Sequence, residues 1–420
     1  MRRPSSLRFC RAAPAAMAVA LWFLRAGTAG ATDWPQWRGP DRSGTTPETG
    51  LLQSWPEGGP RLLWATEGLG SCYSSTAIAD GRIYAPGAIG KDGFLSCLDL
   101  DGRILWKTGY GPEGAGAAAY ARSTPTVDGD RVYLMSAQGK VVCLHAKSGA
   151  LLWTLDTMKE FQAQQLQHGI SESVLVVDHV VVCTPGGTNA TVVGIDAITG
   201  RPVWRTMGLS EASGYNQPIL VRRGKLNVAV IMTDRSLLGL DAANGAVLWR
   251  EPYGDRGVHT ALGQQCFTPV YHDNVIYAPM GAEAVARAYE LAPDGRSIRE
   301  LWEQPRMTVH HGGVVIVDGC VYGTHGHWRA ACLDLRTGTF LYETPQKVGM
   351  AATIYADGML YMGHTDGTVR LVKATPQGYQ LRGQFRIPKG DGEYWSHSAI
   401  ANGRLYLRHG DVLLAYDIRR

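Results

Sequence analysis

The chain has 420 residues, with 41 lysines and arginines against 37 aspartates and glutamates, and a formal net charge of +4 at pH 7. Five of the arginines, and no acidic residue, lie in the first 31 residues, so the remainder carries a formal charge of −1. This near-neutral balance, without any run of lysine or arginine, argues against a nucleic acid as the partner. A chain of this length can also bury a core without disulfide bonds.

Residues 1–31 have the pattern of a secretory signal peptide. Arginines precede an apolar run from Ala12 to Leu24, and Ala29-Gly30-Ala31 supplies small residues for cleavage. The run is too short to span a membrane, and no later segment is long enough to do so. We therefore expect an exported protein, periplasmic or secreted, that is cleaved near Ala31 and has no transmembrane segment in the mature chain.

A short aromatic segment, DWPQWRGPDRSG, occupies residues 33–44 within a predicted lead-in of residues 32–59. Trp34 and Trp37 resemble ligand platforms at first sight. The segment, however, joins the leader to the repeated part of the chain, residues 60–420. We predict that its aromatic side chains pack against the first or last repeat and guide residues 60–67 into place.

Residues 60–420 consist of similar units, each with short alternating or apolar runs bounded by Gly, Asp and Asn, a pattern typical of many short strands. Units such as STPTVDGDRVYLMSAQGKVVCLHAKSGALLW and QPILVRRGKLNVAVIMTDRSLLGLDAANGAVLW end on an aromatic residue. These aromatic ends are 40 to 53 residues apart, and they are Trp106, Trp153, Trp204, Trp249, Trp302, Tyr342 and Phe385. That period is typical of four-stranded propeller blades.

Each unit predicts four strands, A to D. The A–B turn carries Asp-Gly or a relative, as in Asp80-Gly81 and Asn402-Gly403, which suits a tight hairpin. The C–D turn carries Asp-x-x-x-Gly, as in Asp196 to Gly200, where an acidic side chain bonds turn amides and glycine adopts positive φ. The aromatic residue of strand D is expected to pack against the neighbouring blade.

The two ends of the chain complement each other. The last unit supplies strands A, B and C and stops at Arg420, whereas residues 60–67, PRLLWATE, look like a strand D without preceding partners. We therefore predict an all-β, eight-bladed β-propeller of four-stranded antiparallel blades, closed by an N-terminal strand that completes the last blade. Such closure leaves only short, protected sheet edges.

The repeated LDAxxGxxLW unit resembles the tryptophan-docking repeat of pyrroloquinoline-quinone (PQQ)-type propellers, and the resemblance covers essentially all of residues 60–420. The family contains quinoprotein alcohol dehydrogenases and also the propeller lipoprotein of the outer-membrane barrel-assembly machinery. The resemblance implies the fold, but not the function, because one fold serves both classes.

In a propeller, ligands usually bind where the D–A connections converge on the axis. The residues just before strand A in successive units are polar and aromatic, which predicts a lined funnel for a small molecule, a peptide or a protein. The candidate funnel residues are Tyr120, Arg122, Glu172, Asn216, Gln217 and Trp395.

The resemblance to quinoprotein dehydrogenases implies a site for PQQ and calcium. Arg122, Glu172 and Asn216 lie at the corresponding level, and Glu172 with Asn216 would suit a hard cation. The sequence departs from the family at Gln265-Cys266-Phe267, where an aspartate is expected, and it lacks a vicinal Cys-Cys pair. Mature cysteines number seven and are expected to be buried small side chains.

Histidines provide a second candidate metal site. Zinc–nitrogen bonds are ~2 Å long, whereas packed sheets stand ~10 Å apart. Only near-axis residues such as His310 or His311 with His397 could therefore converge on one ion, and exposed loop histidines are the alternative. No GxSxG elbow or paired nucleophile and base is present, so no catalytic residue is predicted.

Two functions remain open from the sequence. The first is a non-catalytic exported propeller, expected to be a monomer, that binds a protein, peptide or small ligand on its funnel. The second is a PQQ- and calcium-dependent oxidoreductase acting on alcohols or sugars.

Overall fold

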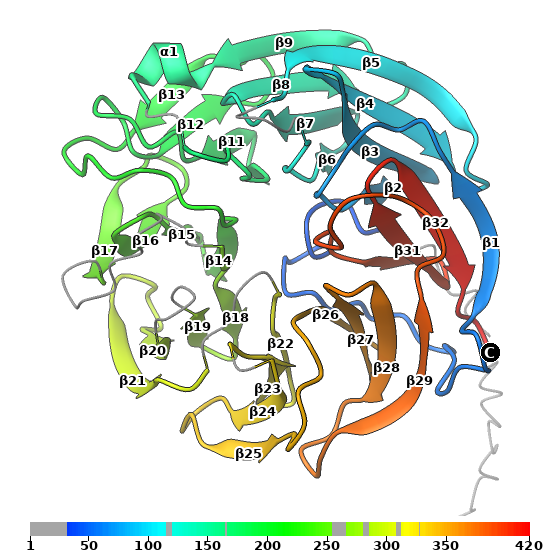
Figure 1. Cartoon of the computed structure of the whole chain (residues 1–420). Coiled ribbons are helices and arrows are strands. Elements are labelled where there is room, and N and C mark those ends of the chain that lie inside the picture. Colours follow the sequence, from blue (N-terminus) through cyan, green and yellow to red (C-terminus); the bar gives the residue numbers. More distant parts are fainter. Residues whose placement is uncertain are drawn as a thin grey trace, which may run out of the picture. The chain divides into compact units, whose positions relative to one another are not determined.

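The computed structural model describes residues 32–114, 120–163, 166–253, 266–279, 285–307, 312–326 and 328–420, and the predicted leader lies outside them. Their strands form eight four-stranded antiparallel sheets arranged in a ring (Figure 1). Within the described residues the single helix is α1 (Thr157–Phe161). No helix in that part of the chain has the length and apolar character needed to cross a membrane. The predicted eight-bladed β-propeller is confirmed.

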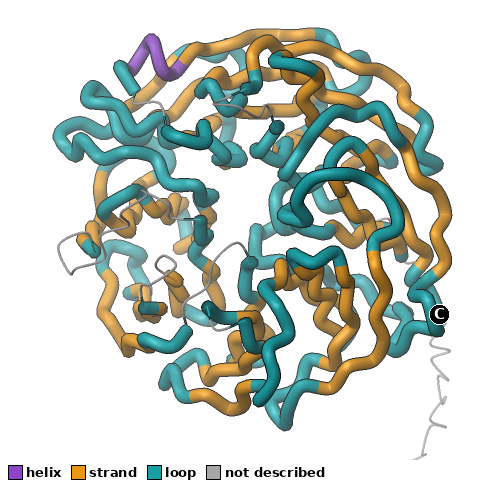
Figure 2. The backbone as a smooth tube through the Cα atoms, viewed as in Figure 1, coloured by secondary structure: helices purple, strands orange, loops and turns teal. Residues whose placement is uncertain are grey.

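The inner strand A of each blade faces the axis and strand D forms the rim, as the ring of strands in Figure 2 shows. In the order A to D, blades 1 to 4 are β2 (Ala77–Ala79), β3 (Arg82–Ile89), β4 (Asp92–Asp99) and β5 (Ile104–Pro112); β6 (Thr126–Asp128), β7 (Arg131–Met135), β8 (Lys140–His145) and β9 (Leu151–Asp156); β10 (Leu175–Val177), β11 (Val180–Cys183), β12 (Val193–Asp196) and β13 (Pro202–Arg205); and β14 (Ile219–Arg223), β15 (Leu226–Met232), β16 (Ser236–Asp241) and β17 (Val247–Pro252). Blades 5 to 8 are β18 (Val270–His272), β19 (Val275–Pro279), β20 (Ala286–Leu291) and β21 (Ile298–Gln304); β22 (Val315–Val317), β23 (Cys320–Thr324), β24 (Ala330–Asp334) and β25 (Phe340–Glu343); β26 (Ala351–Ala356), β27 (Met359–His364), β28 (Thr368–Lys373) and β29 (Gln380–Arg386); and β30 (Ala399–Ala401), β31 (Arg404–His409), β32 (Val412–Asp417) and β1 (Arg61–Thr66).

The ring is closed by the N-terminal strand, as the sequence predicts. Strand β1 pairs antiparallel with β32, from Arg61 opposite Asp417 to Thr66 opposite Leu413. Blade 8 is thereby built from both ends of the repeated region. Strand β1 thus gives the last blade a fourth, outer strand, so that all eight blades have four strands.

Tryptophans of the outer strands fasten six of the eight blades to the next one. These six tryptophans donate Nε1–H to a backbone carbonyl in the C–D turn of the following blade, at 2.8 to 3.2 Å; the pairs are Trp64–Leu100, Trp106–Ala146, Trp153–Ala197, Trp204–Ala242, Trp249–Gly295 and Trp302–Leu335. Trp64 makes this contact across the closure, from blade 8 to blade 1. The strand-D tryptophans therefore pack against the neighbouring blade as predicted, and each also donates a hydrogen bond to it.

The C–D turn glycine is required by the docked indole. Gly200 has φ of +72°, and an added Cβ would lie 2.6 Å from Cδ2 of Trp153. Gly208 also has positive φ, +80°, but an added Cβ there would contact nothing within 4 Å. An alanine at position 208 would therefore add backbone strain alone, whereas an alanine at position 200 would add the same strain and also displace the indole of Trp153.

We expect Gly200→Ala to lower the melting temperature clearly more than Gly208→Ala does. Both variants place alanine in the left-handed region, at a cost of about 1–2 kcal/mol, and Gly200→Ala also displaces Trp153 from its docking position. Thermal unfolding followed by circular dichroism gives the comparison. Equal shifts in the two variants would show that the docked indole contributes no stability at this position.

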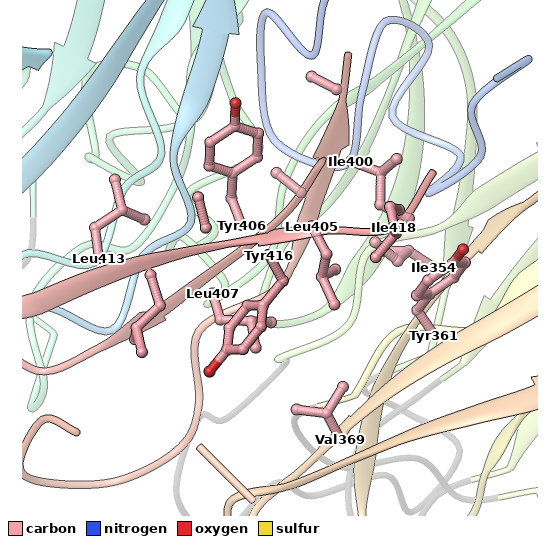
Figure 3. Packing of buried hydrophobic residues seen from close by; sticks show 14 of the residues in the cluster. Ile354, Tyr361, Val369, Ile400, Leu405, Tyr406, Leu407, Leu413, Tyr416 and Ile418 are labelled. Carbon is pink, nitrogen blue, oxygen red and sulfur yellow. The ribbon is translucent and has the colours of Figure 1, made fainter. Parts of the chain in front are cut away.

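The core lies between successive blades rather than at one centre. Figure 3 shows this packing where blades 7 and 8 meet, with Ile354 and Tyr361 on one side and Leu405, Tyr416 and Ile418 on the other. All five are buried. Because each blade contributes one apolar face to each neighbour, no blade buries its core alone.

The lead-in segment enters the ring from the side of the A–B turns. Trp34 is fully buried and exchanges two backbone hydrogen bonds of 2.8 Å with Ile78 of blade 1. Thr46 N–H donates to the carbonyl of Tyr355 in blade 7, and the carboxylate of Glu48 accepts from backbone amides of the blade 8 turn. Contact with the first and last blades is thus present, as predicted.

The same segment also crosses the axis, which the sequence interpretation missed. We call residues 33–46 the axial segment (dark blue in Figure 1). Arg42 donates to the carbonyls of Ser173, Val174 and Pro218 in blades 3 and 4. On the opposite side, Arg38 donates to Val314 before blade 6 and to Thr353 in blade 7. Two buried guanidinium groups therefore join the inner strands across the centre of the ring.

Candidate functional site

The funnel face is the side of the ring that carries the D–A and B–C connections. Three aromatic side chains from blades 8, 1 and 2 gather there, and we call Tyr73, Tyr120 and Trp395 the aromatic platform. The rings of Tyr73 and Tyr120 are stacked, with centroids 4.3 Å apart and an angle of 15° between their planes. Trp395 lies with its centroid 4.8 Å from that of Tyr73. All three are only partly buried, so the platform can accept a partner's side chains.

Backbone pairing between the first two D–A connections holds the stack in place. Tyr73 N–H donates to the carbonyl of Ala121 at 2.8 Å, and Ala121 N–H donates to that of Ser71 at 3.2 Å. The two connections therefore run side by side for a few residues. Stacking of Tyr73 on Tyr120 follows from this pairing, which no periodicity in the sequence indicates.

The connection that carries Trp395 is fastened by a histidine. His409, at the end of β31, has Nδ1 2.8 Å from the carbonyl of Lys389 and Nε2 3.0 Å from the carbonyl of Gly392. Its ring also stacks on Tyr394, with centroids 3.8 Å apart. A neutral imidazole has one N–H and can donate to only one of these carbonyls, so the ring holds the loop before Trp395 by one hydrogen bond and by its stacking on Tyr394.

Arg122 completes the candidate site. Its guanidinium carbon lies 5.3 Å above the centroid of the Tyr73 ring, a cation–π contact. The structure thus brings together Tyr120, Arg122 and Trp395 of the predicted funnel residues with Tyr73, which also precedes a strand A.

The other predicted funnel residues lie deeper and take part in contacts between blades. Gln217 Oε1 accepts from Ser173 N–H, and its Nε2 donates to the carbonyl of Ser171 at 3.0 Å. The amide thereby joins blade 4 to blade 3. Asn216 is buried, and its Nδ2 would lie 2.0 Å from a Cβ added at Gly214.

Glu172 is a buried cap on blade 3 rather than a group that lines the funnel. It is 2 % exposed and accepts from Thr184 N–H at 2.9 Å. Burial raises its pKa to about 7, and the nearby charge of Arg42 from the axial segment opposes that rise. The carboxyl group of Glu172 therefore stabilises the fold, although its place in the repeat made it a candidate ligand-binding residue.

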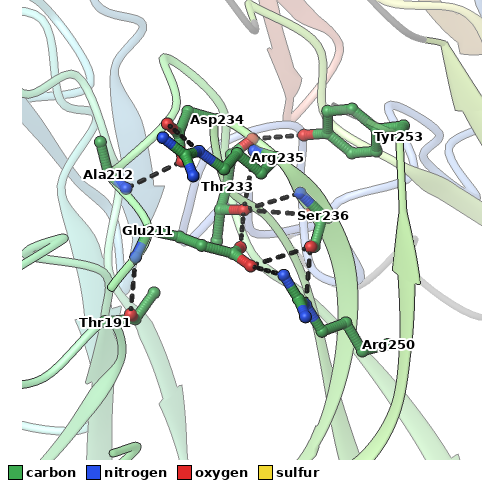
Figure 4. Close-up of polar contacts among 9 residues, drawn as sticks. All are labelled: Thr191, Glu211, Ala212, Thr233, Asp234, Arg235, Ser236, Arg250 and Tyr253. Carbon is green, nitrogen blue, oxygen red and sulfur yellow. Dashed lines mark hydrogen bonds and ion pairs between the residues drawn. The ribbon is translucent and has the colours of Figure 1, made fainter. Parts of the chain in front are cut away.

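Buried glutamates recur at this level in neighbouring blades. Glu113 accepts from Ala137 N–H at 3.2 Å before the C strand of blade 2. In blade 4, Glu211 accepts from the hydroxyls of Thr233 and Ser236 and pairs with Arg250, as Figure 4 shows. These carboxylates satisfy polar groups of the B–C turns that would otherwise be buried without partners.

The predicted histidine site is described only in part. His310 and His311 lie outside the described residues, and His397 has its ring centroid 5.2 Å from that of Trp37. In the described part of the chain, no three His, Cys, Asp or Glu side chains are grouped so as to hold a metal ion. All seven cysteines of residues 32–420 are free thiols.

Trp37 is a funnel residue that the sequence interpretation assigned to packing alone. A small cavity near the axis is lined by Trp37, Arg38, Phe267, Val314 and His397. The axial segment therefore supplies part of the floor beneath the funnel. The sequence offered only the aromatic residue itself as a signal, because the residues that line the cavity with Trp37 lie on distant blades.

A family model described as "Outer membrane protein assembly factor BamB" matches residues 56–187 and 91–343. The chain belongs to this family of PQQ-like propellers. Among curated relatives of the BamB family, the assembly factor of Burkholderia pseudomallei (strain K96243) is 26% identical over 323 residues, which cover 73% of this chain and 75% of that protein. The factor of Yersinia pestis is 23% identical over 275 residues, 61% of this chain and 64% of that protein.

Solved structures extend the likeness of the fold. BamB from Moraxella catarrhalis has a TM-score of 0.63 at 18% identity, covering 85% of this chain and 99% of that one. A quinohemoprotein alcohol dehydrogenase of Pseudomonas putida HK5 has a TM-score of 0.64 at 14% identity, covering 92% and 80%. The fold is therefore shared with both a BamB and a quinohemoprotein alcohol dehydrogenase, and it does not by itself indicate a function.

The described residues of this BamB-family chain do not fit a quinone and calcium site. Calcium takes six to eight oxygen ligands, yet the carboxylate of Glu172 is bonded to Thr184 N–H and buried beside Arg42, and both ends of the Gln217 amide are bonded to backbone. Arg38 and Arg42 are also buried near the axis, where their hydrogen bonds go to backbone carbonyls of the inner strands. We therefore derive no step through PQQ.

The buried carboxyl groups predict how stability depends on pH. Burial raises the pKa of Glu113 to about 8, from an ordinary value of 4.5. Because the folded-state pKa is the higher one, this stabilisation is fully present below pH 4.5 and is lost as the pH rises through about 8. We expect the melting temperature to fall between pH 6 and pH 9, and to fall less steeply in Glu113→Gln.

The control for this prediction is Glu57→Gln at an exposed position of the lead-in. It should reproduce the pH profile of the wild type. An unchanged slope in Glu113→Gln would contradict the assignment of a neutral, buried carboxyl group at position 113.

Proposed function

We propose that the mature chain is an exported, non-catalytic scaffold that binds a polypeptide partner on its funnel face and takes part in outer-membrane protein assembly. Membership of the BamB family supports the assembly role, since the relatives carry that name. The leader pattern of residues 1–31 supports export to the periplasm or beyond.

The observation that carries the proposal is the aromatic platform with Arg122. Aromatic and arginine side chains provide most of the binding energy at protein interfaces. Here they come from three blades, lie within a few ångströms of one another and are only partly buried. A monomeric propeller with such a surface is suited to docking a partner.

The experiment is crosslinking and capture of partners from the cell envelope with wild-type protein and a Tyr120→Ala, Trp395→Ala double variant. We expect the wild type to retain a reproducible set of envelope proteins and the double variant to lose most of it. Leu152→Ala is the control, because this exposed leucine lies on outer strand β9. Equal capture by the double variant would contradict docking on the platform.

The alternative, a quinoprotein oxidoreductase, is tested on the same purified protein. Addition of PQQ with Ca²⁺ should produce neither a quinone absorption band nor a rise in melting temperature. Both changes together would overturn the non-catalytic assignment.

A further inference from the structure

Among the residues that the structure describes, no carboxylate pairs with the guanidinium of Arg122; Glu393, on the loop before Trp395, acts on the neighbouring Tyr73. The guanidinium of Arg122 lies over the Tyr73 ring, and it makes no hydrogen bond or ion pair with the other residues that the structure describes. The side chain is only partly buried. A guanidinium has five donors in a fork that matches a carboxylate.

The ionisable groups that act on Arg122 are weak acids whose pKa values are raised by burial. They are Tyr73, Tyr215, Glu113 and Cys266. Burial raises the pKa of Tyr73 to about 12, of Cys266 to about 11 and of Glu113 to about 8, and it also raises that of Tyr215. Burial lowers the pKa of Arg122 itself, as expected for a cation held without a partner.

We propose that the funnel binds an acidic polypeptide segment, with a partner carboxylate on Arg122 and an adjacent aromatic side chain on the platform. This inference rests on the proposed docking function and specifies the chemistry of the partner. Charge-assisted pairs between arginine and carboxylate are often bidentate, which fixes the position of the bound segment. Stacking on Tyr120 would then place the neighbouring residue.

The shape of the site favours a polypeptide over a small anion. Small ligands bind in enclosed pockets that bury most of their surface, whereas the platform spans three blades and its rings remain partly exposed. The single guanidinium of Arg122 offers one contact for an anion. An extended chain can use that contact and the rings together.

The test uses purified mature protein and synthetic copolymers as probes. Random poly(Glu,Tyr) presents carboxylates beside aromatic rings, poly(Lys,Tyr) has the opposite charge, and poly(Glu) lacks the rings. Binding is measured by biolayer interferometry at two salt concentrations. Arg122→Gln removes the charge, and Arg205→Gln is the matched control on the exposed outer strand β13.

We expect wild type and Arg205→Gln to bind poly(Glu,Tyr) equally and more tightly than poly(Glu), and not to bind poly(Lys,Tyr). Arg122→Gln should bind poly(Glu,Tyr) about tenfold more weakly, the effect of losing one interfacial charge contact. Higher salt should reduce binding by the wild type more than by Arg122→Gln.

Equal binding of poly(Glu,Tyr) by Arg122→Gln, or absence of binding by the wild type, would overturn the acidic-segment assignment. Such a result would leave docking itself intact if the platform variant still loses its envelope partners in the capture experiment. Loss of no partner in that experiment would instead remove the docking function, so the two failures can be told apart.

Discussion

Arg42→Met is expected to lower the free energy of unfolding by at least about 3 kcal/mol. The guanidinium of Arg42 is 1 % exposed and donates to three carbonyls, those of Ser173, Val174 and Pro218. Methionine fills a similar volume but leaves these buried acceptors without partners, and each unmet acceptor costs about 1–3 kcal/mol. Urea unfolding followed by tryptophan fluorescence measures the change.

Arg205→Met serves as the control for this prediction, because it replaces an arginine on the exposed outer strand β13. Its unfolding midpoint should match that of the wild type. A midpoint for Arg42→Met that also matched the wild type would contradict the role of the axial segment in joining the inner strands.

Removal of residues 32–67 is expected to abolish cooperative unfolding. The truncated chain loses β1, which is the outer strand of blade 8, and Trp64, whose Nε1–H donates to Leu100 of blade 1. It also loses both arginines that cross the axis. Calorimetry should show a broad transition in place of a sharp one.

Two further chains separate these contributions. A chain that begins at residue 60 keeps β1 but lacks the axial segment, and it should unfold cooperatively at a reduced temperature. Residues 60–67 appended after Arg420 through the turn sequence of Ala197–Gly200 should restore part of the cooperativity to the truncated chain. A sharp transition at the wild-type temperature in the chain lacking residues 32–67 would contradict closure by β1.

Most of the fold could be predicted because its contacts repeat. Strand-D tryptophans dock on the C–D turn at six of the eight blade junctions, so Trp153 and Gly200 leave the same signal as their equivalents in other units. The closing strand followed from counting strands at both ends of the chain. These features are patterns of neighbouring residues, so they can be recognised in the sequence without knowledge of distant contacts.

The site could be predicted only in part, because its partners are backbone atoms or lie on distant blades. Arg42 binds carbonyls, and Glu172 binds an amide; neither partner has a side-chain signature. Glu172 was a calcium candidate only under the quinoprotein alternative, and its hydrogen bond to Thr184 N–H left no signal in the sequence. Tyr120 and Trp395 were found by their level in the repeat, but their approach to Tyr73 depends on loop pairing that the sequence does not reveal.

Site-specific photo-crosslinking in the producing cell tests the central claim most directly. A photoreactive phenylalanine at position 120 lies on the funnel face, and the same residue at position 152 lies on the rim. We predict crosslinks from position 120 to an acidic segment of an envelope protein, and none to that protein from position 152. Crosslinks from position 152 alone would place the partner on the rim and contradict docking at the funnel.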